Sequence, residues 1–237
     1  MILSQIARIY DPLGLITPVT LGAKVLMRNL CIKNDSKEGK WDTPVDEELR
    51  EEAIQLFDNI LNVEMIRFPR CIKPRRYIGN PTLVVFSDGS DSAYGAVAYI
   101  RWEVTDGIFE ANLLTSKNRI APRKKLSTPQ LELCGALIGS RLRKTIVEKM
   151  DFTFDRIIHL VDSSIVRAQI QKESYGFATF VATRIGEIQS LTDPTEWWWI
   201  PTEENPADMV TRINSADKLS EPMWQKGPSF LTKPVED

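Results

Sequence analysis

The chain has 237 residues, a formal net charge of −2, and 43% hydrophobic and 26% charged residues. This composition excludes a disordered chain, and since no apolar run approaches the roughly 20 residues of a membrane helix, we expect no membrane partner. Three widely separated cysteines without paired spacing argue against a zinc site or a disulfide framework.

The first part of the chain, residues 1–78, is predicted to be mostly helical. A turn signal at 11–14 precedes an apolar-periodic stretch at 17–32. A second amphipathic helix is predicted over 46–61, with acids in its first turn, where the helix dipole favours them. The basic, proline-bearing run 67–76 is predicted to be a connector.

The second part opens with a β pattern. Residues 82–88 form a β-branched and aromatic run, typical of a buried strand, that ends at an acid. Two further strands, 93–102 and 109–116, are joined by short turns and predict an antiparallel meander. A fourth strand, 156–161, also ends at an acid, and a short tryptophan-rich strand is predicted over 196–200.

Helices are predicted after the meander. Ser127 is a hydroxyl cap followed by a proline in the first turn of a helix that continues to about residue 148. Helical sequence also follows Ser163 and covers 177–191, and Asn205-Pro206 precedes a last helix. The complete order predicts an α/β fold, in which a mixed sheet carries helices on its faces.

Four acids stand at the ends of these elements. Asp88 and Asp162 end strands, Glu132 lies near the start of a helix, and Asp208 lies near the start of the last helix. A single acid at such a position is usually a capping or turn residue. Four in this order can converge on one sheet edge, where α/β folds present groups to a ligand crevice. Because His159 is the only histidine, we expect carboxylates to carry the chemistry.

Carboxylates buried together raise one another's pKa unless cations neutralise them. Two Mg²⁺ ions about 4 Å apart would do so and would form the clamp used for phosphodiester hydrolysis. Oxygen ligands suit Mg²⁺, and Mn²⁺ is an alternative. The sequence therefore predicts a two-metal site.

The segments around these acids resemble the RNase H domain of BEL/Pao-type retrotransposon polyproteins. Upstream, residues 9–18 and Trp41-Asp42 resemble the segment that joins reverse transcriptase to RNase H in that family, and downstream residues 223–231 resemble the lead-in to integrase. The four acid-bearing segments are Phe86-Ser87-Asp88-Gly89-Ser90, Pro129-Gln130-Leu131-Glu132-Leu133, Val161-Asp162-Ser163-Ser164 and Asn205-Pro206-Ala207-Asp208-Met209-Val210-Thr211-Arg212.

This resemblance implies an RNase H-like fold and cleavage of the RNA strand of RNA–DNA hybrids. It maps the metal ligands of the family onto Asp88, Glu132, Asp162 and Asp208. It also implies a reverse-transcriptase thumb or connection-like segment at 1–78, an RNase H-like domain at 79–214 and a linker towards an integrase region at 215–237. The implied partners are the reverse transcriptase and integrase portions of the polyprotein, in cytoplasmic virus-like particles.

Contacts to the hybrid are expected near the acids and along a basic run. Ser90 and Gln130 are close enough in sequence to line the groove that holds the hybrid, where minor-groove and 2′-hydroxyl contacts identify RNA. Cations that follow the third strand would hold backbone phosphates. These cations are Lys117, Arg119, Arg123, Lys124 and Lys125.

Two features depart from the usual RNase H pattern or have a simpler interpretation. The loop before the last acid, 201–204, lacks the histidine that RNase H enzymes usually carry there, and strand alternation points His159 to the opposite face from Asp162. We therefore interpret His159 as a packing or hydrogen-bonding residue. For Trp197, Trp198 and Trp199, alternation predicts core packing for at least one, and we expect packing rather than base stacking.

Two other functions remain open at this stage. The chain could bind nucleic acid or act as a scaffold without cutting, in which case it need not respond to Mg²⁺. It could also be an aspartic peptidase, since the BEL/Pao family is also catalogued under a peptidase label. Such enzymes need paired Asp-Thr/Ser-Gly motifs, and neither Asp88-Gly89-Ser90 nor Asp162-Ser163-Ser164 matches.

Overall fold

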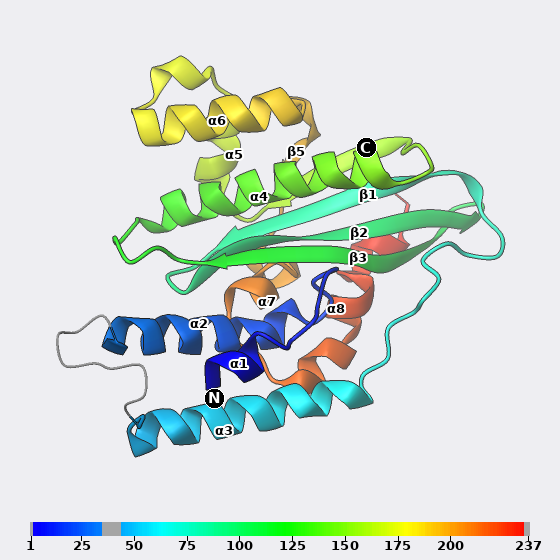
Figure 1. The fold of residues 1–237 in the computed structure, drawn as a ribbon. Coiled ribbons are helices and arrows are strands. Elements are labelled where there is room, and N and C mark those ends of the chain that lie inside the picture. Colours follow the sequence, from blue (N-terminus) through cyan, green and yellow to red (C-terminus); the bar gives the residue numbers. More distant parts are fainter. Residues whose placement is uncertain (1, 35–43, 235–237) are drawn as a thin grey trace.

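The computed structural model describes residues 2–34 and 44–234 (Figure 1). Trp41 and Asp42, which carry part of the upstream resemblance, lie outside these ranges. The described residues contain a five-stranded sheet with the strand order β3-β2-β1-β4-β5. The strands are β1 (Ile78–Gly89), β2 (Ala93–Thr105), β3 (Ile108–Ile120), β4 (Arg156–Val161) and β5 (Trp197–Trp199).

The sheet combines both modes of strand pairing. β1 pairs antiparallel with β2, and β2 with β3, which is the expected meander. β4 runs parallel to β1 on its other side, and β5 runs parallel to β4. Parallel neighbours require crossover connections, which the helices between β3 and β5 supply. The predicted α/β class, with a mixed sheet and helices on its faces, is confirmed.

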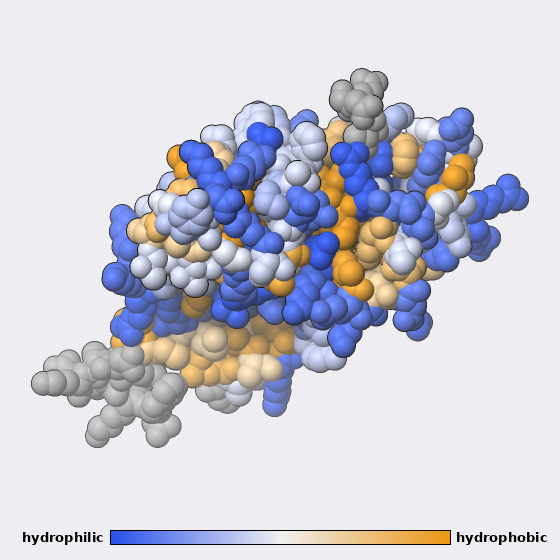
Figure 2. Space-filling view, turned by 90° about the horizontal axis from the view of Figure 1, so that it is seen from above, coloured by the Kyte–Doolittle hydropathy of each residue, from blue (hydrophilic) through white to orange (hydrophobic). Residues whose placement is uncertain are grey.

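Helices cover both faces of the sheet. In Figure 1, α4, α5 and α6 lie above it, whereas α1, α2, α3, α7 and α8 lie below. Seen from the side of α4 and α6, the surface is mainly hydrophilic and contains a narrow apolar strip (Figure 2). Within the described ranges, none of the helices is long and apolar enough to cross a membrane. The helices are α1 (Ile2–Ile6), α2 (Thr17–Asn34), α3 (Glu47–Asn62), α4 (Thr128–Lys149), α5 (Ser164–Ile170), α6 (Thr179–Leu191), α7 (Asp208–Thr211) and α8 (Pro222–Lys226).

Alternate residues of β1 contribute to two separate cores. Leu83 and Val85 pack against α4, whereas Val84 and Phe86 pack on the face that carries α7 and α8. Because both faces are buried, the strand is a continuous apolar run instead of an alternating one. The same alternation turns the side chain of Asp88 to the face of Val84 and Phe86.

The segment after residue 214, which the sequence analysis assigns to a linker, is folded against this second core. Trp224 of α8 is fully buried. Its indole N–H donates to the Leu15 carbonyl at 2.9 Å, and the Tyr99 hydroxyl donates to the Trp224 carbonyl at 2.9 Å. Arg101 Nε donates to the Leu231 carbonyl at 2.7 Å. The C-terminal segment therefore closes the core over β2 and β1.

The N-terminal segment is fixed to the other side of the same face. The Ser116 N–H of β3 donates to the Leu13 carbonyl at 2.9 Å. The Asp11 carboxylate accepts the N–H groups of Leu15 and Ile16 at 2.9 and 3.0 Å, which forms the predicted turn. Gly14 has a φ of 69°, and a Cβ there would lie 2.0 Å from the Ser116 carbonyl oxygen, so only glycine permits this approach.

Candidate active site

Three of the four predicted acids lie where the ends of β1 and β4 meet α4. Ser87 of β1 is in register with Val161 of the parallel strand β4, so Asp88 and Asp162 follow side by side. Glu132 lies in the second turn of α4, which packs on one face of β1. Parallel strands bring their C-terminal ends to one edge, as the sequence predicts.

Two glycines allow α4 to touch the end of β1 backbone to backbone. A Cβ on Gly135 would lie 2.2 Å from the Asp88 carbonyl oxygen, and a Cβ on Gly89 would lie 2.2 Å from the Leu131 carbonyl carbon. Both distances are far shorter than a carbon contact allows, so both positions need the absence of a side chain. This contact places the backbone of Glu132 against Gly89, the residue after Asp88.

Gly135→Ala is expected to lower the free energy of unfolding by about 1–3 kcal/mol, because the added methyl group overpacks the contact with β1. Gly186 in α6 is the matched control, since a Cβ there would meet nothing closer than 3.7 Å. Gly186→Ala should be neutral or stabilising, because alanine favours the helix. Urea denaturation of both variants measures the difference, and equal effects would contradict the proposed close approach.

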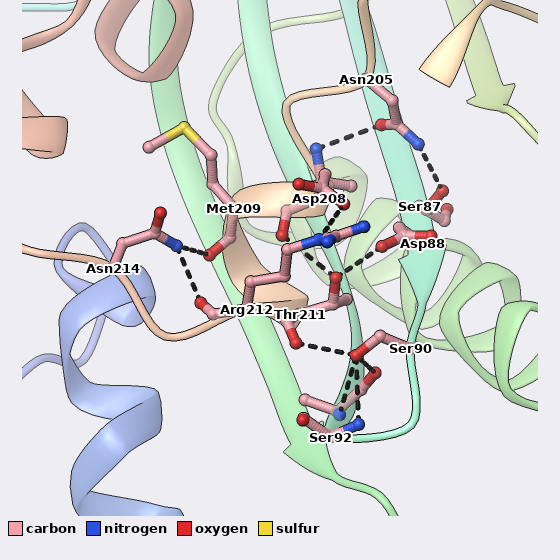
Figure 3. Close-up of polar contacts among 12 residues, drawn as sticks. Ser87, Asp88, Ser90, Ser92, Asn205, Asp208, Met209, Thr211, Arg212 and Asn214 are labelled. Atoms are coloured by element: carbon pink, nitrogen blue, oxygen red, sulfur yellow. Dashed lines mark hydrogen bonds and ion pairs between the residues drawn. The ribbon is translucent and has the colours of Figure 1, made fainter. Parts of the chain in front are cut away.

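Asp208 reaches the same corner from the opposite face, at the start of α7 (Figure 3). The Asn205 side chain donates to the Ser87 carbonyl at 3.2 Å, and the Thr211 hydroxyl donates to Asp88 Oδ2 at 2.5 Å. The Ser90 hydroxyl donates to the Thr211 carbonyl at 2.8 Å. Residues 205–211 are therefore tied to the end of β1. The predicted last helix is α7, which has four residues.

The Asp208 carboxylate is paired with a cation of the chain itself. Arg212 Nε lies 2.6 Å from Asp208 Oδ1, one helical turn further along. The pair is partly exposed to solvent. Asp208 is thus turned towards Arg212 in this structure.

The carboxylates share one electrostatic environment. Asp88 is only 8% exposed, and burial raises its pKa to about 6, although the hydrogen bond from Thr211 opposes the shift. Asp162 and Asp208 raise the pKa of Asp88 further by charge repulsion. Burial also raises the pKa of Glu132 and of Asp162, and each feels another acid of the group. Raised carboxylate pKa values mark a site that favours a bound cation or proton.

The sequence of this region identifies its family. Residues 1–163 match the sequence model described as the Pao retrotransposon-like RNaseH-like domain, and this range includes Asp88, Glu132 and Asp162. The chain belongs to this family. Asp208 lies outside the matched range, so its assignment as the fourth acid depends on the geometry of α7 and on the motif around it. No curated protein matches the chain significantly.

Several solved structures are similar to parts of this RNase H-like chain. The N-terminal RNase H domain of a Mycobacterium tuberculosis protein, solved as a fusion with maltose binding protein, is 17% identical, covers 60% of this chain and 97% of its own, and gives a TM-score of 0.39. RNase H1 from Halobacterium salinarum is 15% identical, and the match covers 53% of this chain and 88% of that chain with a TM-score of 0.32. A foamy viral protease-reverse transcriptase in complex with RNA/DNA hybrid is 16% identical, with 85% and 27% coverage and a TM-score of 0.41. The family assignment rests on the sequence match alone.

The donor set of the RNase H-like site suits a hard divalent cation. All four candidate ligands are carboxylates, and the most buried of them, Asp88, has no cation hydrogen-bonded to it among the described residues. In the described part of the chain, however, no three carboxylate, imidazole or thiol groups converge closely enough to enclose an ion. The acids fit a metal in chemistry, and a closed shell would require their side chains to rotate, Asp208 away from Arg212 in particular.

The residues predicted to contact nucleic acid fall into two groups. The Ser90 hydroxyl holds the β1–β2 turn, and Gln130 Oε1 accepts the Ser127 N–H at 2.9 Å at the start of α4, so both side chains have structural partners. The basic side chains are exposed along the end of β3 and the loop to α4, and β-register links this end of β3 through β2 to Asp88. These are Lys117, Arg119, Arg123, Lys124 and Lys125.

His159 is a packing residue. It is fully buried and stacks on Trp197 with ring centroids 4.4 Å apart and planes inclined by 16°. Burial lowers its pKa to about 3, so the ring is neutral at physiological pH. Neither ring nitrogen has a hydrogen-bond partner in the described part of the chain. The interpretation as packing is confirmed, and the ring lies in the core between β4 and β5.

Sequence reasoning did not identify the residues that hold the acids in place. Asn205 and Thr211 were part of the family motif, but their bonds to Ser87 and Asp88 depend on long-range packing. Gly135 is a single small residue within a helix, and the sequence around it does not predict its contact with β1. Only the position of α4 on β1 shows that Gly135 lies against the Asp88 carbonyl.

Proposed function

We propose that the chain is a ribonuclease H that hydrolyses the RNA strand of RNA–DNA hybrids. The observation that supports the proposal is that Asp88, Glu132, Asp162 and Asp208 lie around the ends of β1 and β4, with α4 and α7 approaching from opposite faces. Their mutual influence on pKa supports a shared site.

These four side chains would hold two Mg²⁺ ions, with Mn²⁺ as an alternative. When bound, the ions supply an activated water and stabilise charge on the leaving 3′ oxygen. Asp88 is the most buried acid and feels the charges of both Asp162 and Asp208, so it would be the central ligand of the site. The Thr211 hydroxyl donates to Asp88 Oδ2 and so orients the carboxylate at the end of β1.

The surface beside the acids suits a polyanion. The exposed basic run from Lys117 to Lys125 begins at the end of β3 next to the acid corner and would contact backbone phosphates. The Ser90 turn and the Gln130 cap would form the groove wall through their backbones. By family, the reverse transcriptase and integrase portions of a polyprotein would be the partners, in cytoplasmic particles.

Purified protein is expected to cut the RNA strand of a labelled hybrid with Mg²⁺ or Mn²⁺ and to lose this activity in EDTA. The same strand in double-stranded RNA and a double-stranded DNA of equal sequence are the controls, and both should remain uncut. Cleavage that persists in EDTA would contradict a metal-dependent site. A folded protein that binds hybrid without cutting it would support the alternative of a nucleic-acid-binding fragment.

A further inference from the structure

Trp199 is held beside the acid corner with its ring exposed. Trp199 of β5 is in register with Val161 of β4, the residue before Asp162. The Trp199 indole N–H donates to the Asp162 carbonyl at 2.9 Å, which fixes the ring against the backbone that carries this acid. The residue is nevertheless 50% exposed, and β5 is an edge strand, so no strand covers its outer side.

The neighbouring tryptophans show that this position is specific. Trp197 is buried, stacks on His159, and donates its indole N–H to the Thr192 hydroxyl at 2.9 Å. Trp198 is 46% exposed but alternates to the opposite face, where it lines a hollow with Leu160 and Phe230. Of these three tryptophans, only Trp199 has both an exposed ring and an indole hydrogen bond to the backbone of a candidate ligand, Asp162.

We propose that Trp199 is a substrate-contact residue that packs its exposed ring on a nucleotide of the RNA strand next to the cleaved phosphate. The inference rests on the proposed function, because it requires an RNA strand to bind at Asp162, whose backbone carbonyl holds the Trp199 indole. An uncharged indole cannot hold a phosphate, but it offers a flat apolar face to a sugar or base, the usual role of aromatic residues in RNA recognition. This differs from the packing role that the sequence suggests for the tryptophan run.

Binding of a fluorescent RNA–DNA hybrid tests the contact in an Asp88→Asn background, which prevents cleavage during the measurement. Trp199→Ala should weaken binding by about fivefold or more, the lower end of what one aromatic stack contributes. Trp199→Phe keeps a ring but not the indole N–H, so its binding should stay within about threefold of the parent, well short of the loss of a full stack. Trp198→Ala is the matched control: Trp198 is 46% exposed but lines a hollow that contains none of the four acids, so this variant should bind normally.

Two outcomes would overturn the proposal. Unchanged binding by Trp199→Ala would remove the contact, and equal losses for Trp199→Phe and Trp199→Ala would show that the bond to Asp162, and not the ring face, is what matters. Circular dichroism melts of all variants check folding. If the parent binds hybrid without cutting it, only the proposed nuclease activity is contradicted, and the binding of the Trp199 variants still decides whether Trp199 contacts the RNA strand. If the parent does not bind hybrid, both proposals are overturned.

Discussion

Asp88→Asn protein is expected to be more stable than the parent in the absence of metal, and inactive in its presence. Burial raises the pKa of Asp88 from 3.8 to about 6, so ionising this group in the folded protein at pH 7 costs up to about 3 kcal/mol, from about two pKa units at about 1.4 kcal/mol each. Asparagine removes this cost and can still accept the Thr211 hydrogen bond. Cleavage should fall by at least about a hundredfold, because a displaced metal ion forfeits several kcal/mol of transition-state stabilisation.

The stability difference should depend on pH in a defined direction. Between pH of about 4 and 6, folded Asp88 binds a proton that the unfolded chain has lost, so the parent loses stability as pH rises through this window. The stability that the folded parent gains from protonated Asp88 is fully present below a pH of about 4 and is lost above a pH of about 6. The advantage of Asp88→Asn should therefore grow from pH 4 to 6 and then level off.

Urea denaturation in EDTA at several pH values measures this advantage. Asp106→Asn, in the exposed turn between β2 and β3, is the control and should show no such trend. Added Mg²⁺ should stabilise the parent and not Asp88→Asn, since a ligand that binds only the folded state stabilises it. A pH-independent difference would show that Asp88 titrates normally.

Trp224→Ala is expected to lower the free energy of unfolding by about 3–5 kcal/mol, the usual range for truncating a buried aromatic side chain. Trp224 is fully buried among residues of β1, β2 and the C-terminal segment, and it donates its indole N–H to the Leu15 carbonyl. For a chain of this size, each kcal/mol shifts Tm by about 2–4 °C, so a fall of roughly 10 °C is expected.

Thermal and urea denaturation measure this effect, with Trp198→Ala as the control. Trp198 is 46% exposed, so its removal should change stability much less. A Trp224→Ala loss below about 1 kcal/mol, the level of an ordinary surface substitution, would show that the C-terminal segment is not part of the cooperative fold. The expected loss would mean that residues 216–232 stabilise the sheet and do not behave as a linker.

Local patterns predict much of the fold. The apolar run before Asp88, the Ser127 cap and the helical sequence after Ser163 each depend on neighbouring residues, and the corresponding elements form close to the expected bounds. Strand ends also place Asp88 and Asp162 side by side, because parallel neighbours share a direction. These features depend on short-range sequence and on sheet geometry.

Features that depend on distant contacts were not predictable. Trp224 lies in a short helix whose amphipathic pattern is too brief to reveal that it is buried under Tyr99. The bonds of Asn205 to Ser87 and of Thr211 to Asp88 join residues more than a hundred positions apart in sequence. The ion pair of Asp208 with Arg212 is local in sequence. The i,i+4 spacing alone does not show whether the Asp208 side chain turns towards Arg212 or towards the other acids.

The contact of Leu13 with β3 has a consequence for association between molecules. An edge strand with free N–H and C=O groups is a template on which a second chain can add a strand. On β3, the Leu13 carbonyl already accepts the Ser116 N–H, and the chain from Asp11 to Gly14 covers that stretch. On the other edge, β5 has only three residues. The Asp11–Gly14 segment and the short length of β5 thus both reduce the strand edge on which a second chain could add a strand.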